Sequence, residues 1–438
     1  MNPSSFPKSL LPMFAILLLG VLPTRAQEVS FSLGDALGRI ERAPVVVQAK
    51  QKFRQAEADL QLAQAQAGVK VDVGGQVSYS WLNPVAANPI GVGLNLGVNV
   101  PLGTSSAAVV ALRQAELNLE SSRISLRQTR GDLARRVVQL FGQVLVADSQ
   151  RTQNTVLLEL AQKQTSVLEE QQRLGSATAT QVLNSRLSLS TAQQNLNKAE
   201  SDWRDKRSSL AGALGLAALP GRPALPNDAP TVPTLEQVLP KLEQCPAVAQ
   251  AVVALAQARL QLEKNLRGFS LSLGLTGDQF GANLNLSVPD FNTQVTVNYQ
   301  PLSANPSTSG TTLTLGANIP VWDGGTTDAA RDSAIIGIEN AQSQLDQARQ
   351  DTRYQLESAI ELARLDAQNL LLQQEAKTVA EGSLKEVKQR LALGAVSPLD
   401  ELAARAGLEA AQGNVLAAQT RMLEDLYQLY AVLGLGGI

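Results

Sequence analysis

The fold is decided by one uninterrupted segment, residues 112–140, which reads LRQAELNLESSRISLRQTRGDLARRVVQL. A leucine returns at every seventh position, in the row Leu112, Leu119, Leu126, Leu133 and Leu140. A strict period of seven keeps one narrow apolar seam against a partner helix, while most of the helix circumference stays polar. The surrounding proline-free stretch runs from Thr104 to Leu174, and at a rise of about 1.5 Å per residue such a helix spans about 100 Å. We therefore expect a protein that works over a long distance.

Outward from this segment, the sequence predicts further elements in a fixed order. A helix rich in Ala and Gln covers 33–67, and two alternating runs at 69–81 and 92–100 predict a hairpin of strands about ten residues long. After the long helix the chain breaks at Gly175, and another helix covers 178–216.

The same order returns in the second half of the chain, where the second long helix is expected at 328–391. Residues from Leu235 repeat those from Leu33 at an offset of 202, and residues from Gly394 repeat those from Gly175 at an offset of 219. The predicted domains are a first repeat at 27–219, a proline-rich linker at 220–233 and a second repeat at 234–438.

The change of offset places the additional residues of the second repeat in its β region, 269–319. This region contains more strand-like sequence than its counterpart, including a candidate extra hairpin around Val288 to Asn292, within 282–300. We expect this hairpin to lie in an enlarged outer loop, which leaves four strands per chain. If it joined the sheet instead, the strand count would rise.

The amino terminus indicates a cleavable secretory signal at 1–26. One lysine, Lys8, precedes an apolar run from Leu10 to Leu22 that is shorter than the roughly 20 residues needed to span a bilayer. Without Lys8 and Arg25, 35 of the 37 basic residues remain against 39 acidic ones, a net charge of −4 that disfavours nucleic acid as a partner. The chain has no histidine and a single cysteine, Cys245, so we expect no catalytic site, no metal and no cofactor.

Four strands of membrane-spanning length cannot close a barrel, and an open sheet edge in hydrocarbon leaves backbone groups unpaired at several kcal/mol each. The strands therefore need copies from other subunits, and two, three or more protomers satisfy closure. The helices are polar over most of their surface, which favours a hollow helical cylinder over a solid bundle. Aromatic residues near strand ends are candidates for a membrane-interface belt, namely Tyr79, Trp81, Phe291, Tyr299 and Trp322. The alternative for these aromatics is packing inside a soluble β domain.

These features together resemble one family, the TolC-type outer-membrane efflux proteins, over nearly its full length. The resemblance rests on the duplicated Leu-x-x-x-Leu…Pro starts at 33–44 and 235–246, on the strand exit Pro320-Val321-Trp322-Asp323-Gly324-Gly325, and on the paired glycine turns. Each glycine turn is followed by an amphipathic helix that ends in Leu-Gly-Leu.

The resemblance implies a mainly α protein with membrane β structure. It implies a homotrimer whose chains each give four strands to a twelve-stranded outer-membrane β-barrel, continuous with a long periplasmic α-helical barrel. Family members are exit ducts of tripartite efflux or type I secretion systems, and they dock onto a periplasmic adaptor protein and an inner-membrane transporter. The competing class is a periplasmic adaptor with coiled-coil hairpins, but adaptors normally have one central hairpin and this chain has two. No motif in the sequence favours an enzyme.

The resemblance also assigns roles at the two glycine turns, which in the family form the periplasmic tip and meet the adaptor. The matching residues here are Gly175, Ser176, Ala177, Gly394, Ala395 and Val396. Asp400 matches the first aspartate of the family's periplasmic gate. The other charged positions of that gate are occupied by uncharged residues here: Ala403 replaces the second aspartate, Val396 the basic tether and Gln181 the acid of the first half. At most one aspartate ring is therefore implied. Ser397, Pro398 and Asp400 also fit the N-cap, N1 and N3 positions of a helix, as Thr178 and Gln181 do in the first half.

Overall fold

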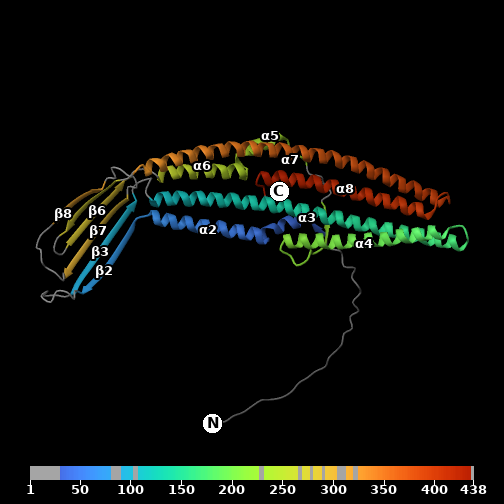
Figure 1. Ribbon diagram of the computed structural model, residues 1–438, viewed down its shortest axis with the longest axis horizontal. Coiled ribbons are helices and arrows are strands. Elements are labelled where there is room, and N and C mark those ends of the chain that lie inside the picture. Colours follow the sequence, from blue (N-terminus) through green and yellow to red (C-terminus); the bar gives the residue numbers. More distant parts are fainter. Residues whose placement is uncertain are drawn as a thin grey trace, which may run out of the picture.

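The computed structural model describes residues 30–79, 90–101, 107–225, 231–264, 269–276, 280–288, 292–302, 312–318 and 324–435. The molecule is elongated, with a sheet at one end and helices that run away from it as long, roughly parallel rods (Figure 1). The predicted signal at 1–26 lies outside the described residues. Among the described helices, none combines the length and apolar character needed to cross a membrane.

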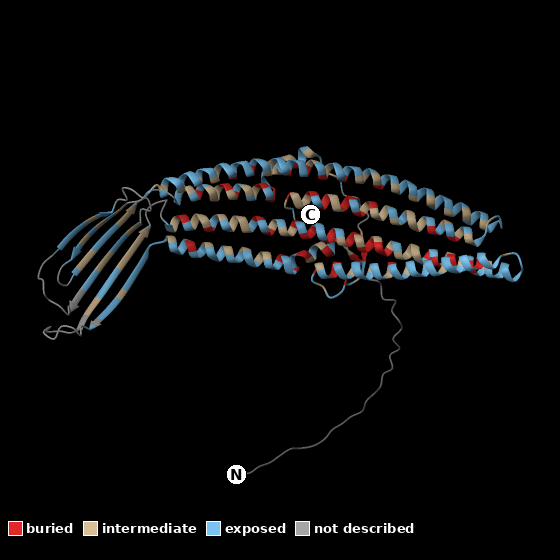
Figure 2. Ribbon diagram, in the orientation of Figure 1, coloured by how far each residue is buried: buried red, intermediate tan, exposed pale blue. Residues whose placement is uncertain are grey.

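Two helices of 67 residues each form the frame of the molecule: α3 (Ala107–Arg173) and α7 (Thr326–Ala392). The sequence prediction of two long helices is confirmed. In the heptad row, Leu126 and Leu133 are buried in the largest apolar cluster, and Leu140 packs against it. Buried residues gather along the middle of the molecule, where α3 runs beside α8 (Pro398–Val432) (Figure 2).

Shorter helices stack end to end along the long ones. In the first repeat α2 (Pro44–Ala67) and α4 (Ala179–Ala213) both pack on α3. At their junction Gly215 has a φ of +69°, and a Cβ there would lie 3.0 Å from Cδ of Pro44. The second repeat has the same junction between α8 and α6 (Pro246–Lys264), where a Cβ on Gly434 would lie 2.8 Å from Cγ of Pro246. Glycine is needed at both junctions for its left-handed backbone and for this close approach.

The first helix of each repeat is shorter than the sequence predicted, because proline interrupts it. The expected helix at 33–67 is divided into α1 (Leu33–Arg39), a 3₁₀ turn η1 (Ile40–Arg42) and α2, with Ala43 extended before Pro44. The second repeat divides in the same way into α5 (Leu235–Val238), η2 (Leu239–Gln244) and α6. Proline has no N–H for the helix and pushes the residue before it into an extended conformation.

The helices form a single layer rather than a bundle. In the half far from the sheet α4, α3, α8 and α7 lie in that order, and in the near half the order is α2, α3, α6 and α7. The seam between α3 and α8 is tight, since a Cβ on Gly131 would lie 3.1 Å from Cα of Ala431. Midway along the molecule, the short strand β1 (Ser30–Ser32) pairs in parallel with β4 (Arg222–Ala224).

The sheet contains six strands, all antiparallel, in the order β2-β3-β7-β6-β5-β8. Their bounds are β2 Lys70–Tyr79, β3 Ile90–Pro101, β5 Phe269–Thr276, β6 Phe280–Val288, β7 Asn292–Leu302 and β8 Thr312–Asn318. The expectation of four strands, with the extra hairpin in an outer loop, is wrong. The extra strands β6 and β7 continue the sheet because their alternating apolar residues fit the register of β3 and β5. Three copies of a six-stranded sheet contain eighteen strands, so the expected barrel of twelve strands does not fit this chain.

We expect Gly142→Ala to destabilise the protein by about 1–3 kcal/mol through overpacking. The added methyl would overlap Cγ2 of Thr420 and lie 3.0 Å from its Cβ. Thr420 is buried, and its hydroxyl donates a hydrogen bond to the carbonyl of Leu416, so it has little room to turn. Thermal unfolding should show a lower melting temperature for Gly142→Ala. The double variant Gly142→Ala/Thr420→Ala should largely recover it, because the second change removes the Cγ2 atom that the added methyl would overlap.

Gly407→Ala is the matched control, because no atom lies within 4 Å of a Cβ at that position of α8. It should leave stability unchanged or raise it slightly, as alanine favours the helix. Equal melting temperatures for Gly142→Ala and Gly407→Ala would contradict the tight seam between α3 and α8.

Candidate functional site

One face of the six-stranded sheet is apolar from edge to edge. Its register places Val98 of β3 between Val71 of β2 and Val295 of β7, and the other strands continue the pattern. The exposed members of this face include Val71, Val73, Val77, Leu94, Leu96, Leu271, Leu273, Leu275, Leu284, Val295, Leu313 and Leu315. None of the described helices covers the sheet (Figure 1), and Val73 keeps 77% of its surface exposed. So large an apolar surface marks a site for lipid or another protein.

The opposite face is polar and almost without charge. Asn95 lies opposite Asn298, which lies opposite Gly281, and Asn285 lies between Gln294 and Ser272. Within the six described strands, only Lys70 and Asp72 are charged, and both lie at the helix end of β2. Glycine, serine, threonine and asparagine at these positions suit a surface that faces water.

Three aromatic side chains lie toward the end of the sheet that is far from the helices. Tyr79 ends β2, Tyr299 lies near the end of β7, and Phe280 opposite Tyr299 begins β6. All three are exposed. Trp81, Phe291 and Trp322 lie outside the described residues. Phe280 is not among the aromatic residues predicted from the sequence, although its place at the start of an alternating run was a usable signal.

The chain has two lateral margins where its layers end. One margin consists of β2, α2 and α4, and the other of β8 and α7. Helix α7 exposes large apolar side chains, among them Ile336, Tyr354, Leu365, Leu371, Leu372 and Val379. The opposite margin exposes Val45 and Leu62 of α2 together with Leu183 and Leu187 of α4. Both margins therefore combine a sheet edge with uncovered apolar helix surface.

Both glycine turns lie at the end of the molecule far from the sheet, one between α3 and α4 and the other between α7 and α8 (Figure 1). Gly175 and Gly394 have φ of +78° and +71° and end their long helices in the same way. In each, the N–H of the following residue donates to a carbonyl five positions back, from Ser176 to Gln171 and from Ala395 to Arg390. Glycine is favoured at this left-handed position.

Both turns expose a leucine that the sequence analysis did not single out. Leu174 is 70% exposed and Leu393 is 83% exposed, and each directly precedes its glycine. Ala177 and Val396, by contrast, are half-buried. The tip thus presents two equivalent apolar points, one per repeat.

Asp400 caps α8, as its position predicted. Its carboxylate accepts hydrogen bonds of 2.8 Å from both the N–H and the hydroxyl of Ser397. These bonds hold the pKa of Asp400 below its usual value, and the bond from the hydroxyl has the larger effect. The exposed carboxylate is therefore ionised at neutral pH. Gln181 makes the same box with Thr178 at the start of α4, but without charge.

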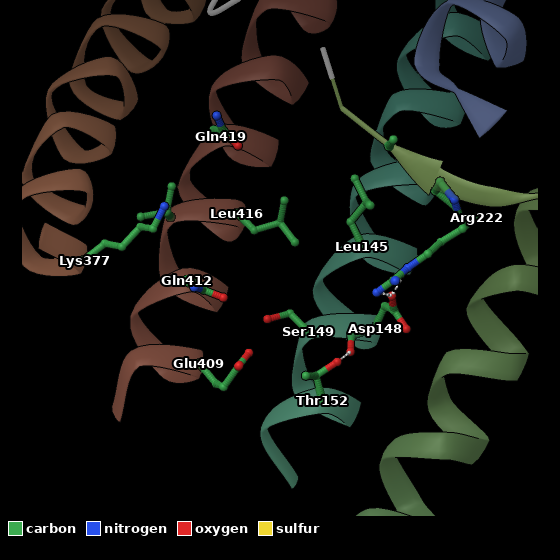
Figure 3. Close-up of a pocket in the computed structure, with 13 residues that line it drawn as sticks. Leu145, Asp148, Ser149, Thr152, Arg222, Lys377, Glu409, Gln412, Leu416 and Gln419 are labelled. Carbon is green, nitrogen blue, oxygen red and sulfur yellow. Dashed lines mark hydrogen bonds and ion pairs between the residues drawn. The ribbon is translucent and has the colours of Figure 1, made fainter. Parts of the chain in front are cut away.

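A cavity of about 650 Å³ lies midway along the molecule between α3, α7, α8 and the linker strand β4 (Figure 3). On its wall Asp148, only 7% exposed, accepts bonds of 2.9 and 2.6 Å from the guanidinium of Arg222 and one of 2.8 Å from Arg151. Lys377 and Glu409 lie on the other side. The ion pair between Arg222 and Asp148 fastens β4 to α3, and Arg151 holds Asp148 from within α3, which gives this site a structural role.

The family comparison covers most of the chain. The model described as "Outer membrane efflux protein" matches residues 39–216 and 242–435. The two matched segments leave out the stretch that contains the proline-rich linker. Comparison with curated protein sequences gives no match.

Solved channel structures share the fold. A crystal structure of CusC matches with a TM-score of 0.68 and 17% identity, over 98% of each chain. The CmeC outer membrane channel of Campylobacter jejuni matches with a TM-score of 0.66 and 14% identity, over 92% of this chain and 86% of that one. The outer membrane protein VceC from Vibrio cholerae matches with a TM-score of 0.63 and 14% identity, over 92% of this chain and 96% of that one.

Two neighbouring positions in the middle of β7 test which face of the sheet meets lipid. Val297 lies on the apolar face and Asn298 on the polar face. Val297→Arg should cost about 2–4 kcal/mol at the centre of a bilayer and prevent folding into the outer membrane. Asn298→Arg should fold normally. Heat-modifiable migration of membrane fractions measures both, and equal behaviour of the two variants would contradict the assignment of the faces.

Proposed function

Since the chain belongs to the outer membrane efflux protein family, we propose that three copies close into one continuous duct that carries solutes from the periplasm to the exterior. The apolar face of the sheet contacts outer-membrane lipid, and the polar face lines the lumen. The helices extend the wall into the periplasm. As in the family, the duct receives its substrates from a periplasmic adaptor and an energised inner-membrane transporter, in an efflux or type I secretion system.

The observation that carries this proposal is the pair of lateral margins. Because the six strands alternate in direction, the edge strands β2 and β8 run in opposite directions. The β8 of one copy can therefore form an antiparallel pair with the β2 of the next. The same contact brings α7 against α2 and α4 and covers the apolar residues that both margins expose. A head-to-tail contact of this kind forms a ring when the rotation closes.

The expected domain boundaries belong to this proposal. The signal at 1–26 directs the chain to the periplasm, and the repeats at 27–219 and 234–438 each give one half of the protomer wall. The linker at 220–233 crosses between them. Its strand β4 pairs with β1 and is held by the ion pairs of Asp148, at mid-height of the helices.

We place the adaptor contact at the periplasmic tip. The turns 175–177 and 394–396 and the exposed leucines Leu174 and Leu393 form its surface. Helix capping by the glycines coexists with this role, because the caps fix the backbone and leave the leucines free to pack against a partner. The repeated geometry provides two equivalent docking points in each copy.

Asp400 serves as a gate residue in this proposal. Three copies bring three ionised carboxylates to the tip, and their summed field favours cations. Ala403, Val396 and Gln181 replace the other charged groups of the family's gate, so the ring of Asp400 stands alone. Capping by Asp400 persists beside this role.

A charge at the tip tests the adaptor contact. Ala177→Glu and Val396→Glu should abolish export of a fluorescent efflux dye from cells, while the native mass in detergent and heat-modifiable migration stay unchanged. Gln139→Glu, at an exposed position midway along α3, is the control and should export normally. Unchanged export by both tip variants would remove these turns from the docking surface.

Reciprocal variants test the gate. Asp400→Asn removes the charge but keeps the acceptor for Ser397, so cation selectivity in a planar bilayer should fall without loss of thermal stability. Gln181→Glu adds a carboxylate that retains the capping box and should raise the selectivity. Unaltered selectivity in both variants would leave Asp400 with the capping role alone.

A further inference from the structure

The extra hairpin enters the sheet at a position that widens it. In sequence β6 and β7 lie between β5 and β8, yet in the sheet they lie between β3 and β5. Their pairing on both sides is extensive, over Thr293–Tyr299 against β3 and over Gly281–Val288 against β5. The edges β2 and β8 are the same with or without the hairpin, so it enlarges the wall and leaves the contact between copies intact.

For strands tilted by about 40°, six match the width of the helical layer more closely than four do. Four helices side by side, at about 8–10 Å between axes, span an arc of about 32–40 Å. Strands spaced about 4.8 Å apart and tilted by about 40° take up about 6 Å of arc each, so six span about 38 Å and four only about 25 Å. The six-stranded sheet therefore continues the helical wall without narrowing.

We propose that the outer part of the duct is a wide chamber walled by eighteen strands and nearly free of charge, and that it admits bulky, hydrated polar solutes without sorting them by charge. This inference rests on the proposed function, which supplies three copies of the six-stranded sheet. At the same spacing and tilt, the backbone diameter is about 36 Å for eighteen strands against about 24 Å for twelve.

The chemistry of the polar face supports the class of solute. Amide and hydroxyl side chains cover it, including Gln76, Asn95, Ser272, Asn283, Asn285, Gln294, Thr296, Asn298 and Thr314. The two charges among the described strand residues, Lys70 and Asp72, have opposite sign and lie at the periplasmic end. A chamber of this kind offers hydrogen bonds to polar molecules and gives no preference for one charge over another.

Polymer exclusion measures the chamber. Poly(ethylene glycol) of graded size is added only on the outer side of a planar bilayer, so that it reports the outer mouth and not the periplasmic tip. The comparison variant lacks residues 280–302, which leaves β5 next to β8 and allows β3 to pair with β5. The backbone diameter falls by about a third with strand number, and inward side chains take the same width from both lumens, so the largest polymer that enters should fall by more than a third in diameter in this variant. Equal cut-offs for both proteins would overturn the inference.

Cysteine pairs test the same point without a deletion. Asn95→Cys with Asn298→Cys joins directly opposite positions of β3 and β7 on the polar face and should form a disulfide in the membrane-inserted protein. Asn95→Cys with Thr276→Cys lies in the same row of the sheet, with Asn298 of β7 and Gly281 of β6 between the two positions. This pair joins β3 to β5 only if the hairpin is absent from the wall, so it should not form a disulfide. The native Cys245 does not interfere, because burial raises the pKa of its thiol to about 11. A disulfide only in the second pair would exclude the hairpin from the wall.

The outcomes separate this inference from the function on which it rests. A small polymer cut-off in the full-length protein, or a β3–β5 disulfide, would contradict the eighteen-stranded chamber and leave the proposed efflux duct intact. Absence of any conducting channel, in a protein that forms the β3–β7 disulfide, would instead contradict the proposed duct.

Discussion

Backbone hydrogen bonding at the two free sheet edges is the constraint on which the rest of the structure depends. An N–H or C=O group left unpaired in hydrocarbon costs several kcal/mol, and β2 and β8 each present a row of them. Within one chain the remaining edges cannot meet, because the sheet is an open layer that continues the single layer of helices. In the proposed duct the edges are satisfied by neighbouring copies, which links membrane insertion to assembly.

The helical part follows from the same requirement. A wall one helix thick cannot bury a large core, and the chain stabilises it with long seams between helices. The leucine row of α3, the close approach of Gly142 to Thr420 and the Gly–Pro junctions at 215 and 434 all hold neighbouring helices in register. Because both repeats use the same junction, the shorter helices extend the wall to the full length of α3 and α7.

Much of this could be predicted from the sequence, and the exceptions have physical causes. The heptad period and the glycine turns located the long helices, the tip and the Asp400 cap, because these are local signals. The split of the first helix was signalled by Pro44 and Pro246, which the alanine-rich pattern around them obscured. The place of β6 and β7 depended on register with β3, a strand about two hundred residues earlier, which no local pattern records.

Imaging of the purified protein in lipid nanodiscs by electron microscopy tests the central claim most directly, because it shows the number of copies and the state of the sheet edges together. The account predicts a three-fold ring in which the β8 of each copy pairs with the β2 of the next and the helical wall continues below without a gap. A single copy in the membrane, or a ring with unpaired β2 and β8 edges facing lipid, would contradict it.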